Sequence, residues 1–373
     1  MFKFAISTCA FALLLAGAQS AICDSIYVET NIVSDVPGLA PVTDPNLKNP
    51  WGVSFSATSP FWVSNTGSNT STLYAASGQP NAIIVAVDGG PTGQVNNGPG
   101  TGFLVGATSA HFIFDTLSGT IQGWSSGNAA AVEASKAGAA YTGLAFGSVN
   151  GSNFLYAANF AQNSIDVFNS SWASTTLAGN FTDPNLPAGY RPFNIQSING
   201  NLYVEYAQAG SGPLSPGRGA GLGIVDIYSP SGVLLQTLIG PGGQLNAPWG
   251  VTLAPAGFGA FGGDLLVGNF GSGQIDAFNP ITGAFIGTID GANGAPLVNS
   301  NLWALEVRTA SGFDNNGIYI TAGINGQTDG LFSVIDTAPE PGTFSMLALG
   351  TGAVAAWLLR RRRSQSRNPV FPG

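Results

Sequence analysis

The chain has very few of the residues from which metal sites and nucleophilic enzymes are usually built. Its 373 residues include two cysteines, Cys9 and Cys23, and a single histidine, His111. A zinc site needs several Cys, His or carboxylate ligands, and one imidazole cannot supply it. Ser125 lies in a Gly-x-Ser-x-Gly motif, but hydrolases of that type carry their histidine after the serine. We therefore predict neither a zinc enzyme nor a serine hydrolase.

Charged residues are also scarce, at 8% of the chain, and the two signs are unevenly distributed. Between Asp24 and Glu340 there are 19 acidic and five basic residues, which gives this part a net charge of −14. Such a surface repels phosphate backbones, so we predict no binding to nucleic acid. It would tolerate or attract divalent cations.

The N-terminus has the three parts of a secretory signal peptide. Lys3 supplies the positive region, residues 4–15 form an apolar run, and Ala18-Gln19-Ser20 is one of two small-residue cleavage sites. We assign the signal peptide to residues 1–20. Because Cys9 leaves with the leader, only Cys23 remains, and no internal disulfide is possible.

The C-terminus carries Pro339-Glu340-Pro341, an uncharged run over residues 343–359, and the cluster Arg360, Arg361, Arg362 and Arg363, followed by residues 364–373. This layout over 339–363 resembles the PEP-CTERM sorting signal of Gram-negative bacteria. The resemblance implies an exosortase partner, transient insertion of 343–359 in the inner membrane, a short cytoplasmic tail at 364–373, and delivery to the cell surface or extracellular matrix. A permanent anchor would also fit the apolar run and the arginines, but the Pro-Glu-Pro favours a removable address.

The remaining residues, 24–336, favour an all-β domain, because 53 glycines and 23 prolines indicate many tight turns. A pattern of short strands repeats six times, with anchor residues at Trp51, Phe103, Thr142, Phe193, Trp249 and Trp303, spaced 39 to 56 residues apart. Six such units predict a six-bladed β-propeller. The last unit lacks one strand, and we expect Ser25–Val33 to supply it beside Leu331–Ile335.

The repeat pattern resembles the NHL and SMP-30/gluconolactonase-like propellers, and the blades with Pro-Trp-Gly-Val resemble an uncharacterised bacterial propeller family. Aligning the second strand of each unit brings polar residues to one ring near the mouth of the channel: Asn65, Asp115, Asn159, Tyr206 and Asn269, with Glu205 one residue away. Their oxygens could hold a divalent cation such as Ca²⁺. The asparagines could equally bond the backbone of their own turns.

Two functions follow from these observations. The first is a non-catalytic binding or structural module, monomeric and exported, whose partner is an exopolysaccharide or a surface protein. The second is a metal-dependent hydrolase or lactonase like the SMP-30 enzymes, which would act through the Asn/Asp ring. The absence of a recognisable catalytic set favours the first.

Overall fold

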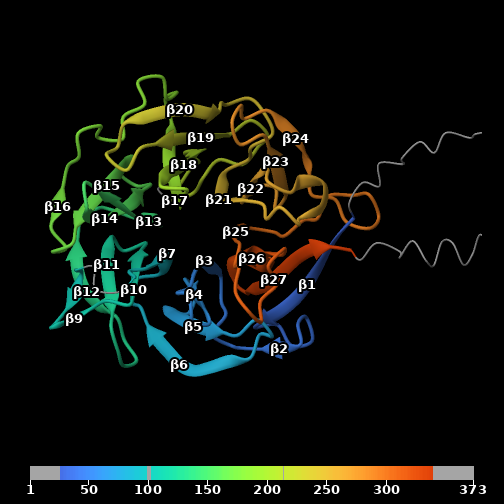
Figure 1. Cartoon of the computed structure of the whole chain (residues 1–373), viewed down its shortest axis with the longest axis horizontal. Helices are drawn as coiled ribbons and strands as arrows, with labels where there is room; N and C mark the ends of the chain where they lie inside the picture. Colours follow the sequence, from blue (N-terminus) through green and yellow to red (C-terminus); the bar gives the residue numbers. More distant parts are fainter. Residues whose placement is uncertain (1–25, 99–101, 213, 339–373) are drawn as a thin grey trace, which may run out of the picture.

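The computed structural model describes residues 26–98, 102–212 and 214–338, which form a ring of six β-sheets around a central axis (Figure 1). Within each sheet, neighbouring strands of the blade pair antiparallel, except that the short strand Val42–Thr43 pairs parallel with Tyr27–Ser34. The only helical segments among the described residues are η1 (Gly259–Phe261) and α1 (Ile324–Gln327). The structure confirms the predicted six-bladed propeller. The signal peptide and the sorting signal lie outside the described residues.

Blades 1 to 5 contain four strands each, and the first strand of each blade is the innermost (Figure 1). Blade 1 consists of β3 (Pro50–Ser54), β4 (Phe61–Asn65), β5 (Thr70–Tyr74) and β6 (Pro80–Ala86). Blade 2 consists of β7 (Pro91–Asn96), β10 (Phe112–Thr116), β11 (Thr120–Trp124) and β12 (Ala131–Ser135), with the small hairpin of β8 (Leu104–Val105) and β9 (Thr108–Ser109) inserted. Blade 3 consists of β13 (Tyr141–Val149), β14 (Ser152–Asn159), β15 (Ser164–Asn169) and β16 (Ser174–Thr175).

Blade 4 consists of β17 (Tyr190–Ile198), β18 (Asn201–Gln208), β19 (Gly223–Tyr228) and β20 (Leu234–Ile239). Blade 5 consists of β21 (Pro248–Leu253), β22 (Leu265–Asn269), β23 (Ile275–Phe278) and β24 (Phe285–Thr288). Blade 6 consists of β25 (Leu302–Glu306), β26 (Ile318–Ala322) and β27 (Leu331–Thr337), completed by β1 (Tyr27–Ser34) and β2 (Val42–Thr43) from the other end of the chain.

The ring is closed by the first strand of the chain. β1 pairs antiparallel with β27, from Tyr27 opposite Thr337 to Ser34 opposite Leu331. This confirms the predicted pairing of the spare N-terminal strand with the last blade. Closure of this kind leaves no open edge between the first and last blades.

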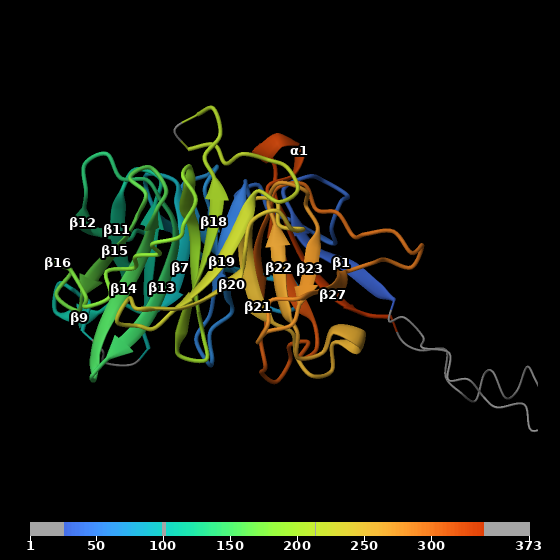
Figure 2. The ribbon, with the colours of Figure 1, turned by 90° about the horizontal axis from the view of Figure 1, so that it is seen from above.

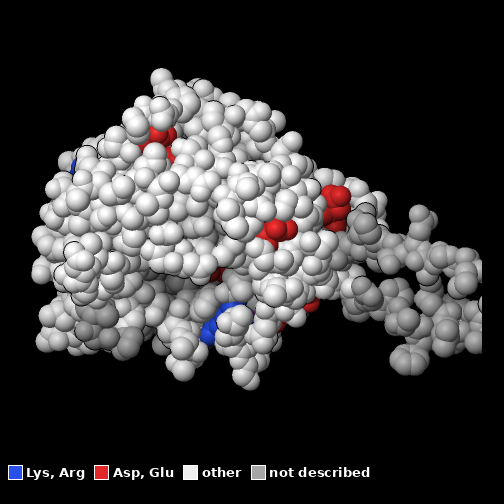
Figure 3. Space-filling view, turned by 45° about the horizontal axis from the view of Figure 1, so that its top comes forward, with Lys and Arg blue, Asp and Glu red and all other residues white. Residues whose placement is uncertain are grey.

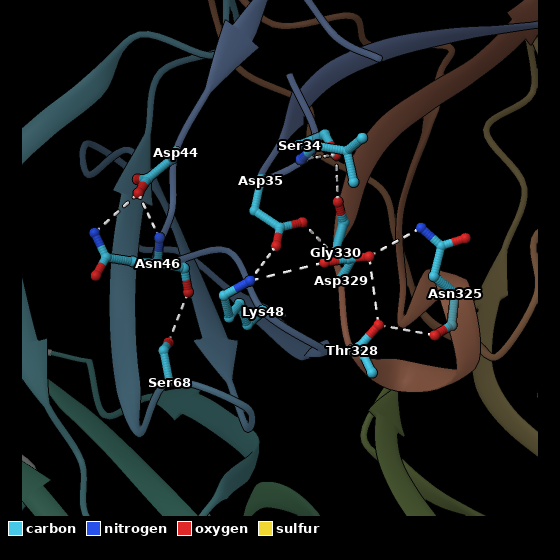
Figure 4. A network of polar contacts seen from close by, with 11 residues as sticks. Ser34, Asp35, Asp44, Asn46, Lys48, Ser68, Asn325, Thr328, Asp329 and Gly330 are labelled. Carbon is cyan, nitrogen blue, oxygen red and sulfur yellow. Dashed lines mark hydrogen bonds and ion pairs between the residues drawn. The ribbon is translucent and has the colours of Figure 1, made fainter. Parts of the chain in front are cut away.

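Polar contacts reinforce the closure beside β1, where the segment after β1 meets the turn before β27 (Figure 4). The Lys48 ammonium lies 2.6 Å from one carboxylate oxygen of Asp35 and 3.7 Å from Asp329. The backbone N–H of Gly330 donates to the other oxygen of Asp35 at 2.7 Å, and the Ser34 hydroxyl donates to the Gly330 carbonyl at 2.7 Å. These contacts join residues 34–48 to residues 329–330, two segments that are far apart in sequence.

The innermost strands approach each other closely around the axis, which explains a recurring glycine. A Cβ atom at Gly52 would lie 2.6 Å from the carbonyl oxygen of Thr92, and one at Gly93 would lie 2.2 Å from the amide nitrogen of Leu144. Gly143 and Gly250 occupy the same position in blades 3 and 5, and a Cβ atom there would also lie within 2.4 Å of the next blade. Glycine after the anchor residue therefore permits the tight ring.

Four of the predicted anchors form an aromatic plug at one end of the axis: Trp51, Phe193, Trp249 and Trp303. Trp51 stacks on Trp303 with ring centroids 3.4 Å apart and meets Trp249 edge-on at 6.0 Å. All of them are buried. The indole N–H of Trp249 donates across the axis to the carbonyl of Thr142 in blade 3 at 2.7 Å.

The anchor predicted for blade 2 is wrong. The first strand of that blade is β7, so the residue equivalent to Trp51 is Thr92 rather than Phe103. Phe103 instead lies in the connection between β7 and β10, buried against Trp172 and Phe146 at centroid distances of 5.0 and 6.2 Å. The error arose because this connection is long and carries the β8–β9 hairpin, while Thr92 is not aromatic.

The two faces of the ring differ, and we call the one that carries α1 the upper face, which is at the top of Figure 2. The innermost strands begin at this face, where the aromatic plug lies, and they end at the lower face. Neither helix of the described residues is long or apolar enough to cross a membrane.

Candidate functional site

A cavity of about 320 Å³ opens along the axis at the lower face, where the innermost strands end. It is lined mainly by residues of β3, β7, β13, β17 and β25, namely Val53, Ser54, Phe55, Gln94, Val95, Asn96, Leu144, Ala145, Phe146, Gln196, Ser197 and Glu306. Farther in, it narrows to a space of about 10 Å³ bounded by Trp249, which holds about one water molecule. The axial cavity therefore ends blindly beneath the aromatic plug.

Three polar side chains stand out in the wall of the axial cavity. The amide of Gln94 donates to the carbonyls of Gly52 at 2.8 Å and Trp62 at 2.7 Å, while its side-chain oxygen is buried without a partner. The amide of Gln196 donates to a carboxyl oxygen of Glu306 at 3.2 Å. The Gln94 side chain is therefore held in place by two backbone carbonyls, and the wall presents a carboxyl group at Glu306.

Glu306 is in an environment that favours its neutral form. Burial raises the pKa of its carboxyl to about 8, because the hydrogen bond from Gln196 offsets only part of the lost hydration. At neutral pH the group is mainly a carboxylic acid, which can donate a hydrogen bond as well as accept one. No Lys or Arg is among the residues that line the cavity, so its polar surface is essentially uncharged.

Two phenylalanines, Phe55 and Phe146, add apolar surface to the cavity wall. Phe55 is held from behind by Arg308, whose guanidinium carbon lies 4.6 Å from its ring centroid and 3.6 Å from that of Phe313. Arg308 is itself buried and donates to the carbonyl of Ser59. An arginine fixed against aromatic rings in this way limits the movement of Phe55.

The asparagines of the predicted ring lie at the upper side of the propeller, and each is bonded within its own region of the ring. The Asn65 amide donates to Thr72 at 2.8 Å. The Asn159 amide donates to Asp166, and the Asn269 amide to Asp276, both at 2.9 Å. These contacts tie the second strand to the third in three blades.

Asp115 and Glu205 do not join those asparagines. The strand register makes Thr116, not Asp115, the equivalent of Asn65, since Thr116 pairs with Pro91 as Asn65 pairs with Pro50. One oxygen of Asp115 accepts from the Gly93 amide at 2.6 Å and from the Thr92 hydroxyl at 2.7 Å, and its other oxygen has no partner. The one-residue error in the alignment of blade 2 places its side chain on the opposite face of β10.

Glu205 is fully buried, and neither carboxyl oxygen has a hydrogen-bond partner. It occupies the same strand position in blade 4 as Asp115 in blade 2. The next ring position, Tyr206, bonds Tyr228 through its hydroxyl at 2.9 Å. Burial raises the pKa of both carboxyls, that of Asp115 to about 7 and that of Glu205 well above its ordinary value.

A metal centre was the other hypothesis for the ring. Over residues 26–98, 102–212 and 214–338 there is no group of three or more His, Cys, Asp or Glu side chains placed to hold a metal ion. Calcium binding through the amide oxygens stays a prediction.

Sequence reasoning missed the axial cavity because it considered the ends of the second strands rather than the first. Gln94, Gln196 and Glu306 lie in innermost strands, each two or three residues after the anchor position. That spacing could have identified them, but only with β7 correctly placed.

Two kinds of relative bear on this chain. A model of the PEP-CTERM protein-sorting motif matches residues 337–363, so the predicted sorting signal is confirmed. It implies processing by an exosortase and hence an exported propeller. Uncharacterized protein R648 of Acanthamoeba polyphaga mimivirus is 30% identical over 321 residues, which cover 82% of this chain and 78% of that protein. The chain belongs to the family of R648.

A second protein similar to this chain comes from the same virus. Uncharacterized protein L690 is 27% identical over 325 residues, covering 80% of this chain and 83% of L690. Among solved structures, a protein of unknown function from Bacteroides thetaiotaomicron is similar, with a TM-score of 0.53 at 12% identity over 84% of this chain and 76% of that one. That likeness shows the propeller fold alone.

Proposed function

We propose that the protein is a non-catalytic binding module that takes a neutral, hydroxyl-rich ligand, the end of an extracellular polysaccharide, in its axial cavity. The observation that carries the proposal is the wall formed by Gln94, Gln196 and Glu306 beside Phe55 and Phe146, a lining that includes no Lys or Arg. Sugar hydroxyls both donate and accept, and sugar rings pack on aromatic faces, so this combination of groups suits them. A volume of about 320 Å³ has room for a terminal sugar.

The test measures binding of neutral gluco-, galacto- and manno-oligosaccharides by titration calorimetry. Glu306→Leu removes the donor and leaves Gln196 unpaired, so we expect binding at least about tenfold weaker, or about 1.4 kcal/mol. Glu306→Gln keeps a donor and should retain binding. In the unmodified protein, affinity should fall as the pH rises through about 8, where Glu306 loses its proton. The Glu306→Gln variant should not show this fall.

Asp88→Asn, which alters an exposed carboxylate after β6, is the matched control and should bind as the unmodified protein does. If no oligosaccharide of the panel binds, or if Glu306→Leu binds normally, the axial cavity is not the ligand site.

We expect the module to be located at the cell surface or in the extracellular matrix, after removal of the sorting signal. The PEP-CTERM match over residues 337–363 supports this. In a host with the sorting enzyme we expect a released protein shortened by the mass of the tail, and in a host without it the full-length protein in the membrane. A full-length protein in the membrane of both hosts would contradict the proposal.

A further inference from the structure

The upper mouth of the axis holds two arginines that have no acidic partner. Arg191 lies in β17, and Arg218 lies in the loop between β18 and β19, which rises beside α1 on the upper face (Figure 2). Lys48 and Lys136, by contrast, each form an ion pair with an aspartate. In the part of the chain that the structure describes, no carboxylate lies within ion-pair distance of either arginine.

Arg218 reaches from blade 4 over the aromatic plug. Its guanidinium donates to the side-chain oxygen of Asn301, before β25, at 2.6 Å, and its central carbon lies 4.2 Å from the ring centroid of Phe270. Phe270 in turn packs on Trp303 at 4.4 Å. Arg218 is nonetheless exposed to solvent, so its other N–H groups remain available to a ligand.

Arg191 is fixed in a similar way above blade 3. Its guanidinium carbon lies 5.8 Å from the ring centroid of Phe160, and one of its nitrogens lies 3.4 Å from the carbonyl oxygens of Phe160 and Ala161. Phe193 contacts both Phe160, at 5.3 Å, and Phe270, at 5.8 Å. The two guanidiniums therefore rest on one continuous aromatic cluster.

Arg308 also has no ion pair among the described residues, but it is buried, so Arg191 and Arg218 are the unpaired cations that a ligand could reach. Charges are few on the face shown in Figure 3, and the region from Asp24 to Glu340 has a net charge of −14. The fork of N–H groups in a guanidinium matches a carboxylate, and aromatic contacts leave that fork pre-organised. The negative charge of the rest of the domain weakens the long-range attraction of any polyanion, so binding depends on the local hydrogen bonds of the two guanidiniums. We propose that Arg191 and Arg218 form a second binding site, for the carboxylates of an acidic polysaccharide.

The experiment compares binding of oligogalacturonate, a carboxylate polymer, with that of neutral galacto-oligosaccharides and inorganic phosphate at low salt. We expect the Arg191→Gln/Arg218→Gln double variant to bind oligogalacturonate at least about tenfold more weakly, because hydrogen bonds between a guanidinium and a carboxylate are stronger than those between neutral groups. Lys136→Gln removes one positive charge that is already paired with Asp166 and should change binding less than about twofold. Arg218→Lys keeps the charge without the fork and should weaken binding in part.

Three results would overturn the proposal: no binding of oligogalacturonate to the unmodified protein, unchanged binding by the double variant, or equal weakening by Lys136→Gln. Phosphate binding as tight as that of oligogalacturonate would show a general anion site instead. Near-ultraviolet circular dichroism checks that the double variant is folded. This site is independent of the axial cavity, so Glu306→Leu should leave oligogalacturonate binding unchanged.

Discussion

A chain that begins at Asp35 instead of Ser25 is expected to lose cooperative folding of the whole propeller. The deletion removes β1 and with it the buried side chains of Tyr27, Ile32 and Val33. Burial of such side chains contributes about 1.5–3 kcal/mol each, and domains of this kind are stable by only about 5–15 kcal/mol. The loss is therefore comparable to the entire free energy of unfolding.

β1 also supports the blade next to its own. The hydroxyl of Tyr27 donates to the carbonyl of Phe258 at 3.1 Å, and its ring packs on Phe258 at 4.7 Å and Phe261 at 5.8 Å, between β21 and β22. Deletion thus exposes an edge of β27 and part of blade 5 together.

Urea unfolding followed by near-ultraviolet circular dichroism measures this effect. The matched control is Val28→Ala in the otherwise intact chain, since Val28 is 42% exposed on the same strand, and its unfolding midpoint should change little. A chain starting at Asp35 that unfolds cooperatively at the original midpoint would show that β1 does not hold the ring together.

Raising the pH from about 4.5 to about 8 is expected to destabilise the fold, opposite to the trend in proteins whose carboxylates are paired. Burial raises the pKa of Asp226 to about 6, that of Asp115 to about 7 and that of Glu306 to about 8, and raises that of Glu205 as well. A raised pKa means that the folded state binds the proton more tightly than the unfolded state does. The stabilisation is therefore complete below the unfolded pKa, near 4, and is lost as the pH rises through the folded value.

The size of the effect is set by the most deeply buried groups. For Asp115, a shift from 3.8 to about 7 corresponds to a loss on the order of 4 kcal/mol once the group is ionised in both states. Urea unfolding at half-unit steps from pH 5 to pH 9 measures it. Glu205→Gln should flatten the curve, because the amide cannot ionise, whereas Asp88→Asn at the surface should not. Stability that rises between pH 5 and pH 8 would contradict the prediction.

The architecture could be predicted from sequence because each blade repeats the same order of short strands and turns. Trp51-Gly52, Thr142-Gly143 and Trp249-Gly250 mark innermost strands, since a Cβ atom at each of these glycines would lie within 2.6 Å of an atom of the next blade. Blades 4 and 6 have Asn194 and Ala304 at this position instead. In blade 2 the corresponding pair is Thr92-Gly93, which has no aromatic residue. The longer connection from β7 to β10 shifted the alignment of this blade.

The axial cavity could not be predicted in the same way. Gln94, Gln196 and Glu306 are far apart in sequence, and only closure of the ring brings them to one wall. Whether a carboxyl such as Glu306 meets a particular amide also depends on strand register. An error of one residue in the register turns every side chain of the strand to the opposite face of the sheet. The isolated burial of Glu205 follows from packing between blades, which no local pattern encodes.

The position of the two chain ends has a consequence for the protein during its sorting. The backbone N–H of Ala338 donates to the carbonyl of Ile26 at 2.7 Å, so the propeller begins and ends at one point on its rim. Only residues 339–342 separate that point from the uncharged run at 343–359, and four residues reach at most about 14 Å. A propeller tethered so closely by its rim would stand on edge at the bilayer. Both mouths of the axis would then face along the plane of the membrane and stay open to ligands.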